Sequence, residues 1–298
     1  MPADRYPRSF DEMIAAKNLI FPPSTFESGK RFRPRPDDII IAPWSKSGTT
    51  WLQQIVHGLR AGGDMDFDDI SRLTPWIEVA DALGIDLDAD QGWWPRAFKS
   101  HYSYNAVPKG ARYIVSFREP RSTLVSYYRF YEGWMFEPGT VTLAEYLAPH
   151  LDRGRGKDYW SHMASWWAQL DNENVLLLSY ELMKEDIRPV VIAVAKFIGI
   201  DADEALIDLV VHQSSREFML EHGDRFDDLL HRLRSDAVGA LPLGAGSTKI
   251  TNSTFDPQRY ELSPEILAVM ERNWAETMGA RFGLHSYDSV VEQLRVTS

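Results

Sequence analysis

The sequence predicts an α/β protein in which a mostly parallel central sheet is flanked by helices. Two observations indicate this fold class. Short apolar runs rich in β-branched residues are separated by amphipathic helical patterns, as in parallel strands joined by helical crossovers. The first run, Ile39–Ala42, passes through a short loop into a helical pattern that begins at Thr49. The chain has 298 residues, 44% of them hydrophobic, so it can enclose a sizeable core.

We assign residues 1–298 to a single domain, because neither an internal repeat nor a low-complexity linker divides the chain. Residues 1–36 are rich in proline and are expected to form an irregular lead-in with one helix over 10–19. Residues 221–257 are poor in apolar side chains and rich in Asp, Arg, Gly and Ser. We therefore expect a partly mobile excursion there that acts as a lid.

Hydrophobic periodicity predicts the remaining elements. Strands are expected over residues 39–42, 97–102, 112–117 and 174–180. Further helices are expected over residues 49–60, 159–170, 189–198 and 204–212. The last strong helix has Ser263 as its cap and Pro264 at its first position, and Gly279 is expected to end it.

Composition excludes several kinds of chemistry. The chain has no cysteine, which rules out disulfides, thiolate chemistry and cysteine metal sites. A formal charge of −11 argues against general nucleic-acid binding but not against an anionic small ligand. Neither a signal core nor a stretch of about 20 apolar residues is present, so a soluble cytoplasmic protein without membrane contact is expected. No metal is expected either, because the Asp86–Asp90 run lacks the glycine turn and closing glutamate of a calcium loop.

The loop after the first strand is the strongest candidate site. A loop between a strand and a helix directs backbone N–H groups and the positive end of the helix dipole at one spot, which suits an anion. Lys46 adds a charge there, and Ser47, Thr49 and Thr50 add hydroxyls. The loop is P-loop-like but not a nucleotide triphosphatase P-loop, because the lysine precedes Gly48. An ordinary turn that opens a helix is the alternative interpretation.

Two further clusters carry chemistry. Arg118 follows a predicted strand and Ser126 lies on the next helix, and a guanidinium beside a hydroxyl suits a phosphate. Lys99 and His101 share one face of another strand, where an imidazole with a near-neutral pKa is suited to accept a proton. Taken alone, each cluster is also compatible with a structural role. The other seven histidines lack such neighbours and are expected to be structural.

These segments resemble the cytosolic-type sulfotransferases that use 3′-phosphoadenosine 5′-phosphosulfate (PAPS). Pro43–Trp51 is similar to their 5′-phosphosulfate loop, and Tyr113–Tyr128, with its Ser-Tyr-Tyr ending, to their 3′-phosphate-binding segment. Lys99-Ser-His101 matches the family's Lys-x-His. The resemblance covers roughly residues 35–280 and implies metal-free, in-line transfer of a sulfuryl group from PAPS to a hydroxyl of a small acceptor. The product would be adenosine 3′,5′-bisphosphate (PAP).

The resemblance also implies roles for individual residues. His101 would be the general base, and Lys46 and Lys99 would stabilise the departing phosphate as an oxyanion hole does. The residues implied in donor binding are Lys46, Ser47, Gly48, Thr49, Thr50, Trp51, Arg118, Ser126, Tyr180 and Lys249. The sequence departs from the family at two places. The stacking Phe of a Thr-Ser-Phe segment is absent, with Phe218 the nearest substitute, and of the Arg-Lys-Gly clamp only Lys249 has an equivalent.

The acceptor pocket is expected to have aromatic walls. Trp76, Tyr104 and Trp134 are the candidates, and such walls suit a phenol or another alcohol, although aromatic side chains are also ordinary core residues. The sequence leaves the identity of the acceptor and the oligomeric state open. Two other functions were weighed: a P-loop kinase that uses ATP, and a non-catalytic nucleotide-binding protein of the same fold.

Overall fold

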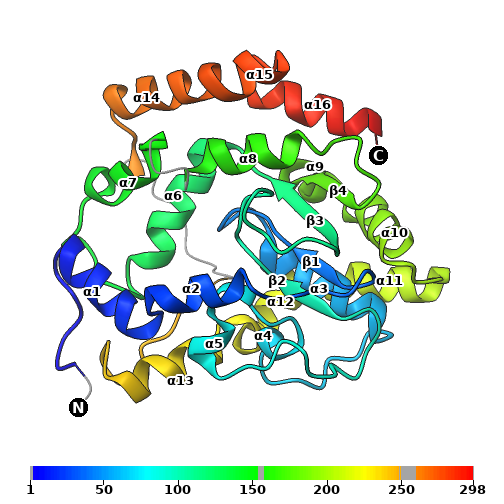
Figure 1. Ribbon diagram of the computed structural model, residues 1–298, viewed down its shortest axis with the longest axis horizontal. Coiled ribbons are helices and arrows are strands. Elements are labelled where there is room, and N and C mark those ends of the chain that lie inside the picture. Colours follow the sequence, from blue (N-terminus) through cyan, green and yellow to red (C-terminus); the bar gives the residue numbers. More distant parts are fainter. Residues whose placement is uncertain (1–2, 154–157, 248, 250–259, 298) are drawn as a thin grey trace.

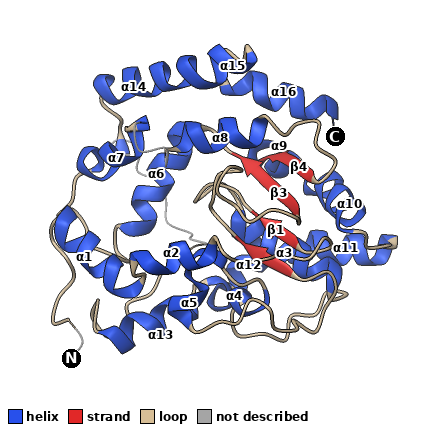
Figure 2. Ribbon diagram, viewed as in Figure 1, coloured by secondary structure: helices blue, strands red, loops and turns tan. Residues whose placement is uncertain are grey.

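The structure, a computed structural model, describes residues 3–153, 158–247, 249 and 260–297. Its strands are β1 (Ile39–Ile41), β2 (Ala97–Lys99), β3 (Arg112–Phe117) and β4 (Val175–Ser179). They form one parallel sheet in the order β2-β1-β3-β4. Because the strands run in one direction, their carboxyl ends meet at the same edge of the sheet (Figure 2). The predicted α/β fold class is confirmed.

Helices cover both faces of this sheet (Figure 1). The helices of the described residues are α1 (Phe10–Ile20), α2 (Pro23–Gly29), α3 (Thr49–Arg60), α4 (Ile70–Leu73), η1 (Ile77–Val79), α5 (Ala80–Leu83), α6 (Pro120–Tyr131), α7 (Leu143–Leu151), α8 (Tyr159–Trp167), α9 (Tyr180–Glu185), α10 (Ile187–Ile198), α11 (Glu204–Gln213), α12 (Arg216–Glu221), η3 (Gly223–Phe226), α13 (Leu229–Val238), α14 (Pro264–Trp274), η5 (Ala275–Gly279), α15 (Ala280–Phe282) and α16 (Tyr287–Thr297). The predicted strands and helices are therefore present, with ends that differ by a few residues.

The alternation of side chains along β1 divides the core into two layers. Ile39 and Ile41 pack in one cluster with apolar residues of α3, α10 and α11. Ile40 faces the other way, into a larger cluster built by α1, α6 and α8 among others. All three isoleucines have no exposed surface, which is expected of a strand covered on both faces. The sheet is thus a rigid platform whose loops carry the candidate site.

Two parts of the chain hold more regular structure than their composition indicates. Residues 1–36 contain α2 as well as α1, and α2 packs so tightly on η1 that a Cβ at Gly29 would lie 2.7 Å from the Ile77 carbonyl oxygen. Within 221–257, the described part forms η3 and α13. Residues 248 and 250–259 of that segment lie outside the described residues, and its action as a lid stays a prediction.

The prediction that Gly279 ends the last strong helix is wrong. The helix begins as predicted, with the Ser263 hydroxyl accepting a hydrogen bond from the Ile266 N–H. Residues Ala275–Gly279 then form one π turn, which continues into α15, and the chain leaves the helix at Gly283, where φ is +69°. The extra residue in the π turn keeps Gly279 at a helical φ of −63°. A glycine in the sequence could not reveal this, because glycine also adopts helical dihedrals.

None of the helices in the described residues combines the length and apolar character needed to cross a membrane. In the same part of the chain, no group of three or more His, Cys, Asp or Glu side chains is arranged to hold a metal ion.

Candidate active site

The candidate residues gather at the carboxyl edge of the sheet. The loop after β1 carries Lys46, β2 ends at Lys99 and is followed by His101, β3 is followed by Arg118, and β4 by Tyr180. In open α/β sheets, ligands bind in the crevice outside this edge. Four segments far apart in the sequence therefore converge because the strands are parallel and in register.

The loop after β1 has the backbone of an anion site. Lys46 and Gly48 both adopt left-handed conformations, with φ of +65° and +97°. A Cβ at Gly48 would also lie 3.1 Å from the Tyr180 ring, so a glycine suits this position on both grounds. Gly48 is the N-cap of α3 and provides no side-chain cap, so the first N–H groups of a 12-residue helix are left for a ligand.

Two hydroxyl groups in the same loop have no hydrogen-bond partner in the part of the chain that the structure describes. The Ser47 Oγ and Thr49 Oγ1 atoms are buried and, among the described residues, form no hydrogen bond. Thr50 is partly exposed on the same turn. Buried polar atoms are nearly always hydrogen-bonded, so these hydroxyls beside the helix N–H groups suit an anionic ligand.

The segment at the end of β3 that carries Arg118, the second candidate phosphate site, is hydrogen-bonded directly to the loop after β1. An Arg118 Nη1 donates a hydrogen bond to the Lys46 carbonyl oxygen at 2.8 Å, and the Ser116 Oγ donates to the Ser47 carbonyl oxygen at 2.5 Å. Tyr159 holds the backbone of Arg118 from the other side, with a hydrogen bond from its hydroxyl to the Arg118 carbonyl oxygen. The two segments predicted to grip one ligand are thus neighbours in space.

A cavity of about 330 Å³ adjoins Arg118. It is lined by Arg118, Ser122, Tyr180, Glu181, Lys184 and Glu185. The Arg118 guanidinium lies 4.6 Å from the Tyr180 ring centroid, and the Trp51 ring meets Tyr180 edge-on at 5.8 Å. Ser126 lies one turn beyond Ser122 on α6 and is partly exposed. The predicted residues Trp51, Arg118 and Tyr180 are therefore brought together beside a cavity.

Two lysines, Lys46 in the loop after β1 and Lys99 at the end of β2, concentrate positive charge at the carboxyl edge of the sheet. Burial lowers the pKa of Lys46 to about 7, and repulsion by Lys249 and Arg118 adds to the effect. Burial likewise lowers the pKa of Lys99 to about 8, with repulsion from Lys249. The two ammonium groups lie over aromatic rings, Lys46 over Phe130 and Lys99 over Trp76, each 4.3 Å from the centroid. A bound anion would stabilise their charged forms.

His101 is held in one tautomer. Its Nδ1 lies 2.7 Å from the Pro43 carbonyl oxygen. Because a carbonyl only accepts, Nδ1 carries the proton and Nε2 keeps a free lone pair. Burial of the ring is the main cause that holds the pKa of His101 well below its usual value, and repulsion from the Lys99 charge is the second. The imidazole is therefore neutral at pH 7, the form that a general base needs.

Glu78 supports the end of β2 and was not predicted. Its Oε1 accepts hydrogen bonds from the Ser100 hydroxyl at 3.0 Å and from the His101 N–H. The same segment pairs with β2 at Trp76, opposite Lys99. Burial raises the pKa of Glu78 to about 7. An acidic residue that follows Pro75-Trp76-Ile77 is the only signal in the sequence, and nothing there links it to residues 100–101.

Lys249 is held by a residue that the sequence did not single out. Its Nζ lies 2.5 Å from Asp228 Oδ1, and the carboxylate is buried while the lysine side chain is 9% exposed. Burial would raise the pKa of Asp228, but Lys249, His231 and Lys99 outweigh it and hold that pKa well below its usual value. Asp228 is thus an ionised carboxylate beside the lysine cluster. The charge of Lys249 is already paired in this structure.

The three aromatic residues predicted for the acceptor separate into two groups. Trp76 and Trp134 both contact the ring of His231. Tyr104 instead packs on Tyr113 and Trp166, and the structure does not bring it to the two tryptophans. Trp76 also lies 5.2 Å from the His101 ring, next to the candidate base.

Phe218 does not join Trp51 and Tyr180, the aromatic residues implied in binding the donor. It stacks on His222 with the centroids 4.2 Å apart and meets His212 edge-on. The Trp51 Nε1 donates instead to the Ser214 carbonyl oxygen at 2.7 Å. Ser214 belongs to the segment in which the family's stacking Phe is absent. This segment thus fixes the Trp51 side chain through a backbone carbonyl group.

The fold and the loops at the carboxyl edge define an α/β protein with a P-loop-like strand, loop and helix. The profile of the sulfotransferase domain matches residues 36–228 of the chain. The chain therefore belongs to the sulfotransferase domain family, and the family suggested by the motifs is confirmed.

Curated relatives agree with this membership. A dog sulfotransferase 1B1 is 31% identical over 212 residues, which cover 67% of this chain and 71% of the relative. A rat sulfotransferase 1C2 is 31% identical over 206 residues, covering 64% and 68%. A rabbit amine sulfotransferase is 28% identical over 198 residues, covering 63% and 64%.

Solved structures share the fold. A retinol dehydratase in complex with androsterone and inactive cofactor PAP has a TM-score of 0.66 at 15% identity, covering 93% of this chain and 97% of that one. A mouse sulfotransferase complexed with PAP has a TM-score of 0.62 at 19% identity, covering 93% and 94%. At this level of sequence identity, the similarity to these two structures shows a shared fold and nothing more.

Proposed function

We propose that this protein is an O-sulfotransferase, which moves a sulfuryl group from PAPS to a hydroxyl of a small aromatic acceptor and releases PAP. The observation that carries the proposal is the hydrogen bond from Arg118 to the Lys46 carbonyl oxygen, because it places two cationic cradles side by side. One ligand with a phosphate at each end suits this arrangement. Family membership supports the reaction class.

The residues present fit such a donor. The free N–H groups at the start of α3, with the orphaned hydroxyls of Ser47 and Thr49, would hold the 5′-phosphosulfate. Arg118 and Ser126 would hold the 3′-phosphate, with Trp51 and Tyr180 beside the adenine. When bound, PAPS supplies a sulfuryl group on a phosphate oxygen, and the protein supplies position and charge. Lys249 would have to exchange its bond with Asp228 for one to the donor.

His101 would accept the proton of the acceptor hydroxyl at Nε2. Its Nδ1 is fixed by the Pro43 carbonyl oxygen, so the ring cannot turn without losing that bond. Lys46 and Lys99 would neutralise the charge that develops on the phosphate oxygen where the bond to sulfur breaks. In a loose transfer of this kind, positioning and charge neutralisation supply most of the rate.

Glu78 would be a positioning residue for this base. It binds the backbone N–H of His101 and the side chain of Ser100, so it fixes the end of the strand that carries Lys99 and His101. Its contact with the reacting groups is indirect, through the backbone.

The proposal is tested by donor binding and by transfer. PAP is expected to raise the unfolding midpoint of the protein in a thermal shift assay, whereas ATP with Mg²⁺ is not. Labelled sulfate from PAPS is expected to appear on a phenol in the presence of the wild-type protein and not with His101→Ala. Sulfate transfer to an aniline that matches the phenol in shape is measured alongside, and the comparison shows whether the acceptor group is a hydroxyl or an amine. Stabilisation by ATP and phosphate transfer would favour a kinase instead, and PAP binding without transfer would favour a non-catalytic protein.

A further inference from the structure

The cavity beside Arg118 is lined by a second cation. Lys184 lies in the last turn of α9 and lines the same cavity of about 330 Å³. It follows Tyr180 by four residues, so the two side chains lie on one face of that helix. The Tyr180 ring centroid lies 4.6 Å from the Arg118 guanidinium. Arg118 and Lys184 therefore meet the cavity on the same side of α9.

The sheet brings two helices to this cavity. β3 and β4 pair in register, with Phe117 opposite Ser179, and α6 and α9 begin just after these strand ends. Ser122, in the first turn of α6, also lines the cavity. Ser126 follows it by four residues, so the face of α6 suggested to bind phosphate continues into the cavity. A ligand there meets a hydroxyl group of α6 and the ammonium group of Lys184.

The carboxylates that line the cavity are bound by other groups of the protein. Glu181 accepts hydrogen bonds from the Glu119 N–H at 3.1 Å and from the Tyr287 hydroxyl. Glu185 forms an ion pair of 2.8 Å with Arg295 of α16. Among the described residues, neither carboxylate forms an ion pair with a cation that lines the cavity.

The two cations of the cavity lack carboxylate partners. In the part of the chain that the structure describes, neither Arg118 nor Lys184 forms an ion pair. Because Arg295 pairs with Glu185, only Glu181 among the described carboxylates lining the cavity has no cationic partner. The cations that line the cavity therefore outnumber its unpaired carboxylates, which favours a ligand with more than one negative charge.

We propose that Lys184 binds the 3′-phosphate of the donor together with Arg118, and thereby selects PAPS over adenosine 5′-phosphosulfate, which lacks that phosphate. This inference rests on the proposed function, since it assigns a further residue to the same donor site. A phosphate monoester carries up to two negative charges, so one guanidinium leaves part of that charge unpaired. Lys249, which the sequence suggests for donor binding, is already bound to Asp228. The Lys184 ammonium, on a flexible stem, supplies the second positive charge.

The test compares two nucleotides that differ only in the 3′-phosphate. Dissociation constants of PAP and adenosine 5′-monophosphate are measured by calorimetry at one ionic strength, and the wild-type protein is expected to bind PAP more tightly. Lys184→Gln is expected to weaken PAP binding about 10-fold and to leave the affinity for the monophosphate unchanged. This is the low end for a hydrogen bond to a charged group, because Lys184 is exposed. Lys184→Arg retains the charge and should retain the preference.

Lys196→Gln is the matched control. Lys196 is also exposed and lies in the last turn of a helix, α10, but it does not line the cavity. This variant removes the same charge and is expected to keep both affinities. In steady-state kinetics, Lys184→Gln should raise KM for PAPS by a factor similar to the loss of PAP affinity.

The possible failures separate the inference from the proposed function. A wild-type preference for PAP that Lys184→Gln leaves intact, or a loss of affinity that is equal for both nucleotides, would overturn the inference alone. A wild-type protein that binds PAP no more tightly than the monophosphate, or that does not bind PAP, would overturn the proposed function with it.

Discussion

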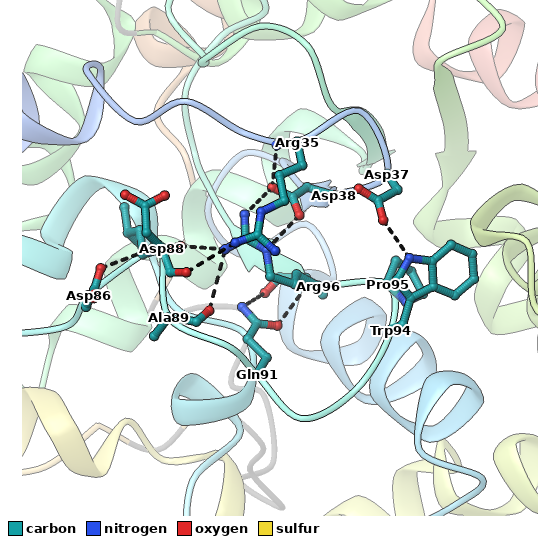
Figure 3. A network of polar contacts seen from close by, with 12 residues as sticks. Arg35, Asp37, Asp38, Asp86, Asp88, Ala89, Gln91, Trp94, Pro95 and Arg96 are labelled. Atoms are coloured by element: carbon teal, nitrogen blue, oxygen red, sulfur yellow. Dashed lines mark hydrogen bonds and ion pairs between the residues drawn. The ribbon is translucent and has the colours of Figure 1, made fainter.

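The two edges of the sheet use buried positive charge in opposite ways. At the amino edge, just before β1 and β2, the Arg96 guanidinium makes two hydrogen bonds to Asp38, at 2.9 and 2.7 Å, and a third to the Leu87 carbonyl oxygen at 3.0 Å (Figure 3). At the carboxyl edge, neither Lys46 nor Lys99 forms an ion pair with any described residue. The positive charge at the amino edge is paired within the protein, and we propose that a bound anion pairs the positive charge at the carboxyl edge.

The comparison separates groups that hold the fold from groups that we propose act on a ligand. The Asp38 carboxylate also accepts the Arg35 N–H at 2.7 Å, so the ion pair at the amino edge is satisfied on several sides. At the carboxyl edge, burial and mutual repulsion lower the pKa values of Lys46 and Lys99 instead. Substitutions at the two edges should therefore give opposite signatures, one in stability and the other in turnover.

His101→Ala should have the largest effect on catalysis. We expect kcat for sulfuryl transfer to fall about 10²- to 10⁴-fold, as for the loss of a general base, with only a small drop in the unfolding midpoint from the lost hydrogen bond to the Pro43 carbonyl oxygen. Steady-state kinetics with PAPS and a phenol measure this. His285→Ala, at an exposed position outside the site, is the control and should turn over normally. A His101 variant with normal kcat would show that the proton leaves by another route.

Asp38→Ala should give the opposite signature. It leaves the Arg96 guanidinium buried without its partner, which is expected to cost about 3–5 kcal/mol of stability. Urea unfolding measures this loss, and kcat per folded molecule should be retained. If the variant is as stable as the wild type, the amino edge does not hold the fold in the way its contacts indicate.

Lys46→Ala should slow transfer without weakening the fold. The loss of a group that stabilises developing negative charge costs about 2.7–4 kcal/mol in the barrier. The unfolding midpoint should stay the same or rise, because the change removes repulsion with Lys249 and Arg118. Lys30→Ala, at an exposed site, is the control. Near wild-type turnover in the Lys46 variant would contradict its proposed role.

The last prediction is a pH dependence of PAP binding, which requires no substitution. Lys46 and Lys99, with pKa values of about 7 and 8, are charged below these values and lose their charge as the pH rises through them. The affinity for PAP should therefore fall between pH 7 and 9, by at most about tenfold per pH unit for each proton taken up. Calorimetry in buffers of different ionisation enthalpy should show proton uptake on binding. An affinity that is constant or rises over this range would contradict the assignment.

The sequence predicts what depends on local pattern. Four apolar runs indicate four strands, and a loop with Lys46 and Gly48 before a helical pattern indicates an anion site. Because parallel strands share one carboxyl edge, the convergence of Lys99 and Arg118 on that loop follows from the fold class. The roles of these residues remain proposals.

What the sequence could not predict depends on contacts between distant segments. Glu78 reaches the backbone of His101 only because the chain from Pro75 pairs with the end of β2. His231 and Asp228 reach Trp76 and Lys99 from a segment whose polar composition indicated a partly mobile excursion. Hydrophobic periodicity carries no information on such pairings, since a buried polar residue looks like an exposed one in sequence.

A crystal structure of the protein with PAP and a phenolic acceptor tests the central claim most directly. The 5′-phosphate should lie on the loop of Lys46 and the start of α3, the 3′-phosphate against Arg118 and Ser126, and the acceptor hydroxyl within hydrogen-bond distance of His101 Nε2. A PAP molecule that leaves either cradle without a phosphate, or an acceptor hydroxyl out of reach of His101, would contradict it.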